Sequence, residues 1–147
     1  MRLISWWLLR AVLAALFLYA GVAKLTDVRA FAADIANYRL LPPALVAPFA
    51  ATVPGVEVAC GLGLLYPRTV RAAAFLATAL LVAFTVAAVQ ALARDINLDC
   101  GCFGSVRAPV TVLTVARDTA LVAAAVAVAA LGRGADETAP RARGPEG

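Results

Sequence analysis

The sequence contains no histidine, and this absence excludes several kinds of site at once. Histidine is the most common general base near neutral pH, a frequent haem ligand and a usual ligand of catalytic zinc. Charge is also scarce, because Asp, Glu, Lys and Arg make up only 15% of the 147 residues. The net charge of +4 is modest and the arginines stand at the ends of apolar runs, which argues against nucleic acid as a partner. Any chemistry must come from thiols, from carboxylates or from a partner protein.

Apolar residues are what the sequence has in excess. They make up 63% of the chain and give a mean hydropathy of +0.88, whereas soluble domains contain about 45–50% apolar residues. Four runs, at approximately 6–25, 44–66, 69–92 and 109–131, are long enough to cross a hydrocarbon core, which takes roughly 20 helical residues. The sequence predicts an all-α polytopic membrane protein, a four-transmembrane-helix bundle over 1–132, with a disordered polar tail at 133–147. A signal peptide is the alternative for the first run, although that run is long and contains Arg10.

The connection between the first two runs has a helical pattern of its own. Val28, Phe31, Ile35 and Tyr38 recur at spacings of three, four and three residues. This spacing predicts a short amphipathic helix in the membrane interface, with a partly ordered loop as the alternative.

Two of the three cysteines, Cys100 and Cys102, lie one residue apart in the stretch "NLDCGCFGSV" between the last two runs, with Gly101 and Gly104 in the turn. A disulfide between them would close a three-residue loop worth only about 1.6 kcal/mol, so it is a poor structural staple. Strained, exposed disulfides exchange readily, which favours a redox pair. Two alternatives stay open: half of a metal site completed by nearby aspartates or a second molecule, and incidental free thiols. The sequence identifies no metal site with a full ligand set.

The third cysteine, Cys60, is predicted to be separate from the pair. It lies sixteen residues into the second run, about 24 Å from the surface that holds the pair, so we expect a small buried packing residue. Around it, Gly55, Ala59 and Gly63 form a small-xxx-small stripe that would let another helix approach closely.

Four charged residues fall well inside the runs, away from their ends: Arg10, Glu57, Arg117 and Asp118. An intramembrane charge costs about 2.5–3.5 kcal/mol, so these side chains should face the bundle interior and find partners. Depths counted from the outer surface are about 20 Å for Glu57, about 22 Å for Arg10 and about 12 Å for Arg117. Glu57 with Arg10 is therefore the expected pair, and Arg117 is the second candidate partner. The pair would either fix helix register or serve a proton or quinone role.

An even number of spans places both termini on one side of the cell membrane. That side carries six Lys and Arg residues at or beyond the span ends, against five on the other, which favours cytoplasmic termini only slightly. The cysteine loop would then be extracytoplasmic, where disulfides persist.

Four stretches together resemble one family: "YAGVAKLTD" at the end of the first run, "YRLLP" before the second, "PGVEVACGLGLL" within it, and "DCGCFG" before the fourth. They are similar to the methylamine-utilisation MauE family, within the wider DoxX-like membrane proteins. The similarity runs over about 18–121, and "DCGCFG" is its most specific part. The positions that match the pattern are Lys24, Glu57, Cys100, Cys102, Gly104 and Arg117.

The resemblance implies a four-helix membrane protein associated with disulfide chemistry. In that family the namesake is thought to help mature or export the disulfide-rich small subunit of methylamine dehydrogenase, beside a thioredoxin-like partner. We therefore expect a membrane accessory that exchanges its disulfide with a thioredoxin-like or exported disulfide-containing protein. Whether the chain is itself an enzyme stays open, as does the use of a quinone. The alternatives are a non-catalytic membrane subunit of an oxidoreductase complex, and a small transporter or quinone-linked carrier that uses Glu57 and Arg117.

Overall fold

The computed structural model describes residues 2–94 and 110–131, and this part of the chain forms five helices and no strand. In chain order the helices are α1 (Arg2–Thr26), α2 (Val28–Tyr38), α3 (Pro43–Leu65), α4 (Val70–Ala93) and α5 (Val112–Leu131). All but α2 are long and apolar enough to cross a membrane. The predicted all-α fold with four spans and one short intervening helix is confirmed, and no span boundary differs from the expected one by more than three residues.

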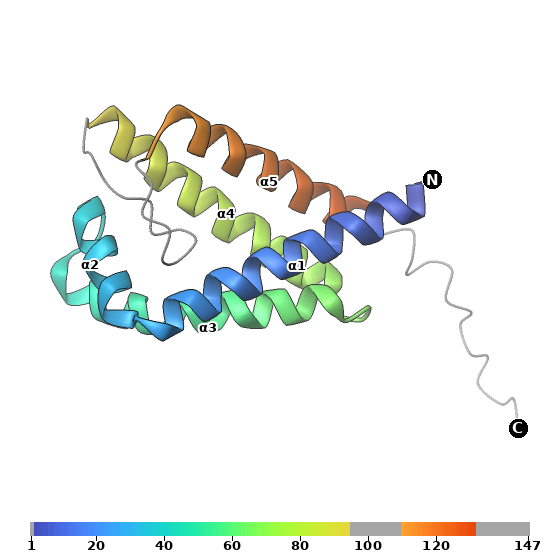
Figure 1. The fold of residues 1–147 in the computed structure, drawn as a ribbon, viewed down its shortest axis with the longest axis horizontal. Helices are drawn as coiled ribbons and strands as arrows, with labels where there is room; N and C mark the ends of the chain where they lie inside the picture. The colour runs from blue at the N-terminus through green and yellow to red at the C-terminus, as the bar shows by residue number, and fades with distance from the viewer. Residues whose placement is uncertain (1, 95–109, 132–147) are drawn as a thin grey trace, which may run out of the picture.

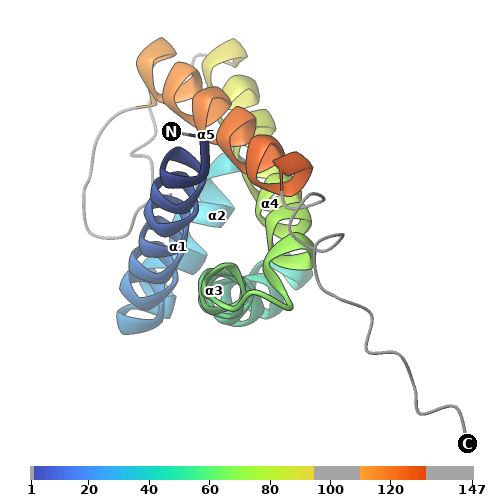
Figure 2. The ribbon, with the colours of Figure 1, turned by 90° about the vertical axis from the view of Figure 1, so that its right-hand side faces the viewer.

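The four long helices form a ring. α1 packs mainly against α3, and α4 packs mainly against α5, while contacts of α3 with α4 and of α1 with α5 close the ring. Figure 2 looks along the bundle and shows the four helices around a common axis. The start of α1 and the end of α5 lie at one end, whereas α2, the end of α4 and the start of α5 lie at the other (Figure 1). We call the second of these the α2 end.

The short helix α2 is fixed by its caps and by one apolar face. The side chain of Asp27 accepts a hydrogen bond from the amide of Ala30 at 2.9 Å, and Arg39 ends the helix in a left-handed conformation with φ of 50°. Phe31 and Ile35 are buried against the first turns of α3. The spacing read from the sequence therefore identified both the helix and its buried face.

The closest helix approach is between α1 and α3, and it depends on two glycines. A Cβ atom at Gly21 would lie 2.7 Å from Cγ2 of Val58, and one at Gly61 would lie 2.7 Å from Cγ of Leu18. At Gly21 the backbone oxygen of Pro54 would also lie 2.8 Å from the added Cβ, so a larger residue there requires the two helices to move apart. At Gly61 the side chain of Leu18 would have to shift. Small residues serve this purpose wherever helices pack in lipid.

The stripe expected from the sequence is not the one that packs. Gly55 and Ala59 are exposed, and a Cβ atom at Gly55 would meet nothing within 4 Å. Only Gly63 lies close to a neighbour, since its added Cβ would be 3.0 Å from Cβ of Ala73. The reason is helix rotation: the buried face of α3 runs through Ala50, Val53, Pro54, Glu57, Cys60, Gly61 and Leu64, which turns Gly55 and Ala59 outward.

The outward surface of the bundle is strongly apolar. Val112 and Leu113 are each 78% exposed, and further large apolar side chains are exposed on each of the four long helices. A surface of this kind suits contact with lipid chains and not with water.

Candidate functional site

A buried ion pair joins α1 to α3 near the α2 end. Nζ of Lys24 lies 2.5 Å from Oε1 of Glu57, and both side chains are 1% exposed. The rings of Phe31 and Phe84 lie 5.2 Å and 5.1 Å from the ammonium, close enough for cation–π contacts. The pair combines a residue from the end of one span with one from the middle of another.

The sequence predicted a different partner for Glu57, and that prediction was wrong. Counting depth from the span ends assumed that α1 and α3 begin and end at the same level. The contacts show otherwise: Gly21 packs beside Pro54 and Val58, so Lys24, about one turn further along α1, lies beside Glu57. The first turns of α3 extend past α1 and pack against α2 instead. Membrane depth in α3 was therefore overestimated.

Arg10 has a role at the opposite end of α1. Its Nε donates a hydrogen bond to the backbone carbonyl of Leu64, and its guanidinium lies 4.5 Å from the ring centre of Trp7 and 5.2 Å from that of Trp6. The side chain is 2% exposed. Arg10 therefore fixes the start of α1 against the end of α3 and is no partner of Glu57.

Arg117 was expected inside the bundle, but 46% of its side chain is exposed. It donates hydrogen bonds from Nε and Nη2 to Oδ1 of Asp118, at 3.0 Å and 2.8 Å. The Asp118 side chain itself is 3% exposed. The inward-facing charge of α5 is thus the carboxylate of Asp118, which was expected to face the interior but was assigned to no pair. The adjacent Arg–Asp pair within one span was the signal that could have identified its partner.

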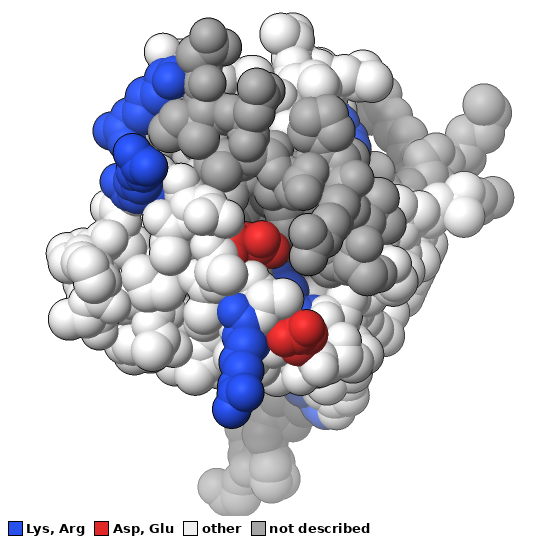
Figure 3. Space-filling view, turned by 60° about the vertical axis from the view of Figure 1, so that its left-hand side comes forward, with Lys and Arg blue, Asp and Glu red and all other residues white. Residues whose placement is uncertain are grey.

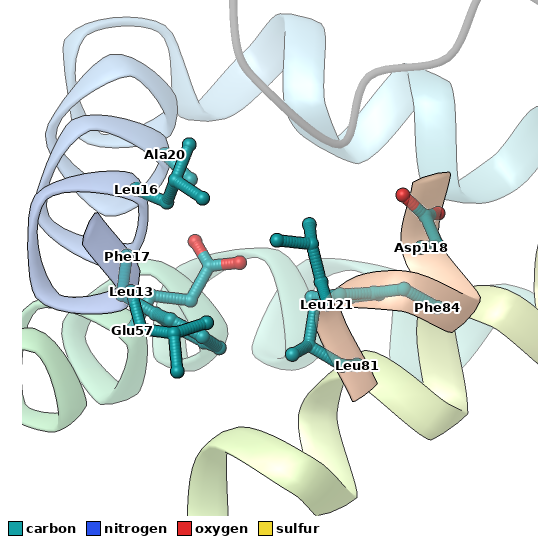
Figure 4. Close-up of a pocket in the computed structure, with 9 residues that line it drawn as sticks. All are labelled: Leu13, Leu16, Phe17, Ala20, Glu57, Leu81, Phe84, Asp118 and Leu121. Atoms are coloured by element: carbon teal, nitrogen blue, oxygen red, sulfur yellow. The ribbon is translucent and has the colours of Figure 1, made fainter. Parts of the chain in front are cut away.

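Glu57 and Asp118 face the same small cavity of about 20 Å³ between the four long helices (Figure 4). Seven apolar residues complete its lining: Leu13, Leu16, Phe17, Ala20, Leu81, Phe84 and Leu121. Within residues 2–94 and 110–131, Oε2 of Glu57 and Oδ2 of Asp118 have no hydrogen-bond partner. A cavity of this size has room for about one water molecule. We call it the carboxylate cavity.

Cys60 behaves as the sequence predicted. It is 1% exposed, and its Sγ lies 3.2 Å from the backbone carbonyl oxygen of Ala73 near the start of α4. The start of α4 is at the opposite end of the bundle from the α2 end (Figure 1). The thiol is therefore a packing group between α3 and α4.

The paired cysteines Cys100 and Cys102, with Gly101 and Gly104, lie outside the described residues. The two ends of the segment that carries them are described. The segment leaves α4 after Arg94 and returns just before α5, and both points are at the α2 end (Figure 1). Val110 packs there with Ala88 and Ala91 of α4 and with the partly buried Tyr38 of α2. In the described part of the chain, no three Cys, Asp or Glu side chains are grouped as metal ligands would be.

These features define a class: an all-helical membrane protein with four spans, a short helix beside them, and a buried Lys–Glu pair at the end that receives the cysteine segment. The comparisons name the family within this class. The family model described as "Methylamine utilisation protein MauE" matches residues 1–131, and the chain belongs to this family.

Curated relatives agree with this assignment. The chain is 38% identical over 125 residues to methylamine utilization protein MauE of Paracoccus denitrificans. This match covers 84% of this chain and 67% of the relative. The chain is 39% identical over 127 residues to the protein of the same name from Paracoccus versutus, covering 85% and 68%. The match to that of Methylophilus methylotrophus is 40% over 84 residues, and it spans only 44% of the relative. No solved structure matches the chain significantly.

Proposed function

We propose that this chain is a membrane accessory protein of methylamine utilisation that exchanges a Cys100–Cys102 disulfide with a thioredoxin-like partner, in the maturation of an exported protein. One observation carries the proposal: a chain of this family holds two cysteines one residue apart, in the connection between two spans. The methylamine pathway enters through the relatives, each of which is named a methylamine utilization protein.

The described ends of the connection support a docking place for the partner. Both Arg94 and Val110 lie at the α2 end, where α2 adds a second element to the surface of the bundle. Figure 3 looks onto this end and shows acidic and basic side chains on it. We propose that this end faces the extracytoplasmic side of the cell membrane, with the termini in the cytoplasm.

The proposed exchange needs no group beyond the thiols of the two proteins. A partner thiolate attacks one sulfur of the Cys100–Cys102 disulfide, a sulfur–sulfur bond forms between the proteins, and the other cysteine leaves as a thiolate. The second partner thiolate then attacks the mixed disulfide, which leaves the partner oxidised and this chain with two reduced cysteines. The same bonds change in the opposite order if the partner is the oxidant. Strain in the three-residue ring favours its opening.

The proposal is tested by trapping the mixed disulfide. In Cys100→Ser and Cys102→Ser variants the remaining thiolate can still attack the disulfide of an oxidised partner, but the second cysteine that would release the partner is missing. One of the two variants should therefore accumulate a covalent complex with a thioredoxin-like protein. Membranes are quenched with acid, free thiols are alkylated, and the complex is identified by mass spectrometry after electrophoresis without reductant. Cys60→Ser is the matched control, because Cys60 is buried and bonded to α4, and it should trap nothing.

Two results together would end the proposal: no mixed species in either single variant, and growth on methylamine unchanged in both. The non-catalytic subunit described by the sequence analysis would then account for the chain better.

A further inference from the structure

A second cavity lies on the other side of the Lys24–Glu57 pair. Glu57 lines the carboxylate cavity, Lys24 lines the second cavity, and Phe84 lines both. The second cavity has a volume of about 170 Å³ and lies between α1, α2, α3 and α4, near the α2 end. We call it the aromatic cavity, because four aromatic side chains line it: Phe31, Tyr38, Phe49 and Phe84.

Its size and its entrance restrict what it could hold. An engineered apolar cavity of about 150 Å³ in another protein accepts benzene, so a single six-membered ring with small substituents fits here. Leu40 and Phe49 in its lining are 37% and 40% exposed, so the entrance is apolar and lies on the surface. Such an entrance favours a molecule that arrives dissolved in the membrane.

Lys24 restricts the chemistry further. An ammonium group carries three N–H donors, and Glu57 is its one hydrogen-bond partner among the described residues. The remaining donors require an acceptor, which a hydrocarbon chain cannot supply. An anionic ligand would supply one but would place a further negative charge beside Glu57 and close to Asp34, which also lines the cavity. A neutral ring that bears a carbonyl oxygen meets both conditions.

We infer that the aromatic cavity binds the ring of a membrane-soluble quinone, with one carbonyl oxygen accepting a hydrogen bond from Nζ of Lys24. Phe31 and Phe84 line the same cavity as Lys24, so a ring bound there would lie beside the ammonium and both phenyl rings. Glu57 holds Lys24 in place from the other side.

The test is binding of a water-soluble short-chain benzoquinone to the full chain in lipid nanodiscs, measured by equilibrium dialysis. Ala87 lines the cavity, so Ala87→Phe fills it and should weaken binding at least tenfold. Ala79 lies exposed on the same helix, so Ala79→Phe is the matched control and should bind as the wild type does. The Lys24→Met/Glu57→Gln double variant keeps the interior neutral and should weaken binding about tenfold through loss of one charged hydrogen bond.

Three outcomes would overturn the inference. These are the absence of saturable binding, equal binding by Ala87→Phe and the wild type, and equal affinity for an alkylbenzene that lacks the carbonyl groups. The last would identify an apolar lipid pocket. Replacing both Cys100 and Cys102 by serine should leave binding unchanged, so failure of the proposed disulfide exchange and failure of this inference are separate results.

Discussion

The Lys24–Glu57 pair makes a quantitative prediction about stability. Both side chains are 1% exposed, and removal of one partner of a buried pair leaves an uncompensated charge that costs about 3–5 kcal/mol. Lys24→Met should also lose the contacts of the ammonium with Phe31 and Phe84, each worth about 0.5–1 kcal/mol. The single variant should therefore lose about 4–7 kcal/mol, which is a large part of the 5–15 kcal/mol typical of whole proteins.

Reversible unfolding of the purified chain in mixed micelles, followed by circular dichroism, measures these losses. In the Lys24→Met/Glu57→Gln variant neither member of the pair is left as an unpaired buried charge. Its loss of unfolding free energy should therefore be about 3 kcal/mol smaller than the sum of the losses in the two single variants. Arg68→Gln is the control, since this exposed side chain donates a hydrogen bond to the hydroxyl of Tyr66 at the surface and should change stability by no more than about 0.5 kcal/mol. Additive losses, or a loss under 1 kcal/mol in Lys24→Met, would show that the two side chains do not form the pair described.

Three further predictions follow from packing, and the same unfolding measurement checks each. Gly21→Ala should destabilise the bundle by about 1–3 kcal/mol, because its Cβ would overlap α3. Gly55→Ala adds a Cβ that meets nothing within 4 Å, so it should be neutral or slightly stabilising. Equal effects of the two variants would contradict the assigned rotation of α3. Arg10→Met should cost about 2 kcal/mol by removing the bond to Leu64 and the stacking on two tryptophans, and a silent variant would refute that role. Cys60→Ala should cost less than about 2 kcal/mol and leave thiol exchange intact, while loss of exchange would make Cys60 part of the redox chemistry.

The elements of this fold could be predicted from sequence because each has a local cause. Apolar length identifies the four spans, and the spacing of Phe31 and Ile35 identifies the buried face of α2. The burial of Glu57, Arg10 and Asp118 follows from the cost of charge in lipid, which requires no knowledge of the neighbours. Cys60 was placed correctly for a similar reason, since its position along one helix was enough.

Pairing between helices could not be predicted, because it depends on the rotation and vertical offset of each helix. Gly61 packs against α1 and Gly55 faces outward because of the rotation of α3, although both belong to small-residue patterns in the sequence. The partner of Glu57 was predicted to be Arg10 and is Lys24, because the vertical offset between α1 and α3 was not known: α3 extends beyond the end of α1 to reach α2. Neither the rotation nor the vertical offset of a helix can be read from the sequence of one apolar run.

The most direct test of the central claim is the state of Cys100 and Cys102 in intact cells. A Cys60→Ser chain is treated with a membrane-impermeant maleimide before and after reduction by an impermeant phosphine, and the labelled peptides are quantified by mass spectrometry. We predict no labelling before reduction and labelling of both cysteines after it, as an extracytoplasmic disulfide requires. Labelling before reduction, or labelling only after the membrane is permeabilised, would contradict the account.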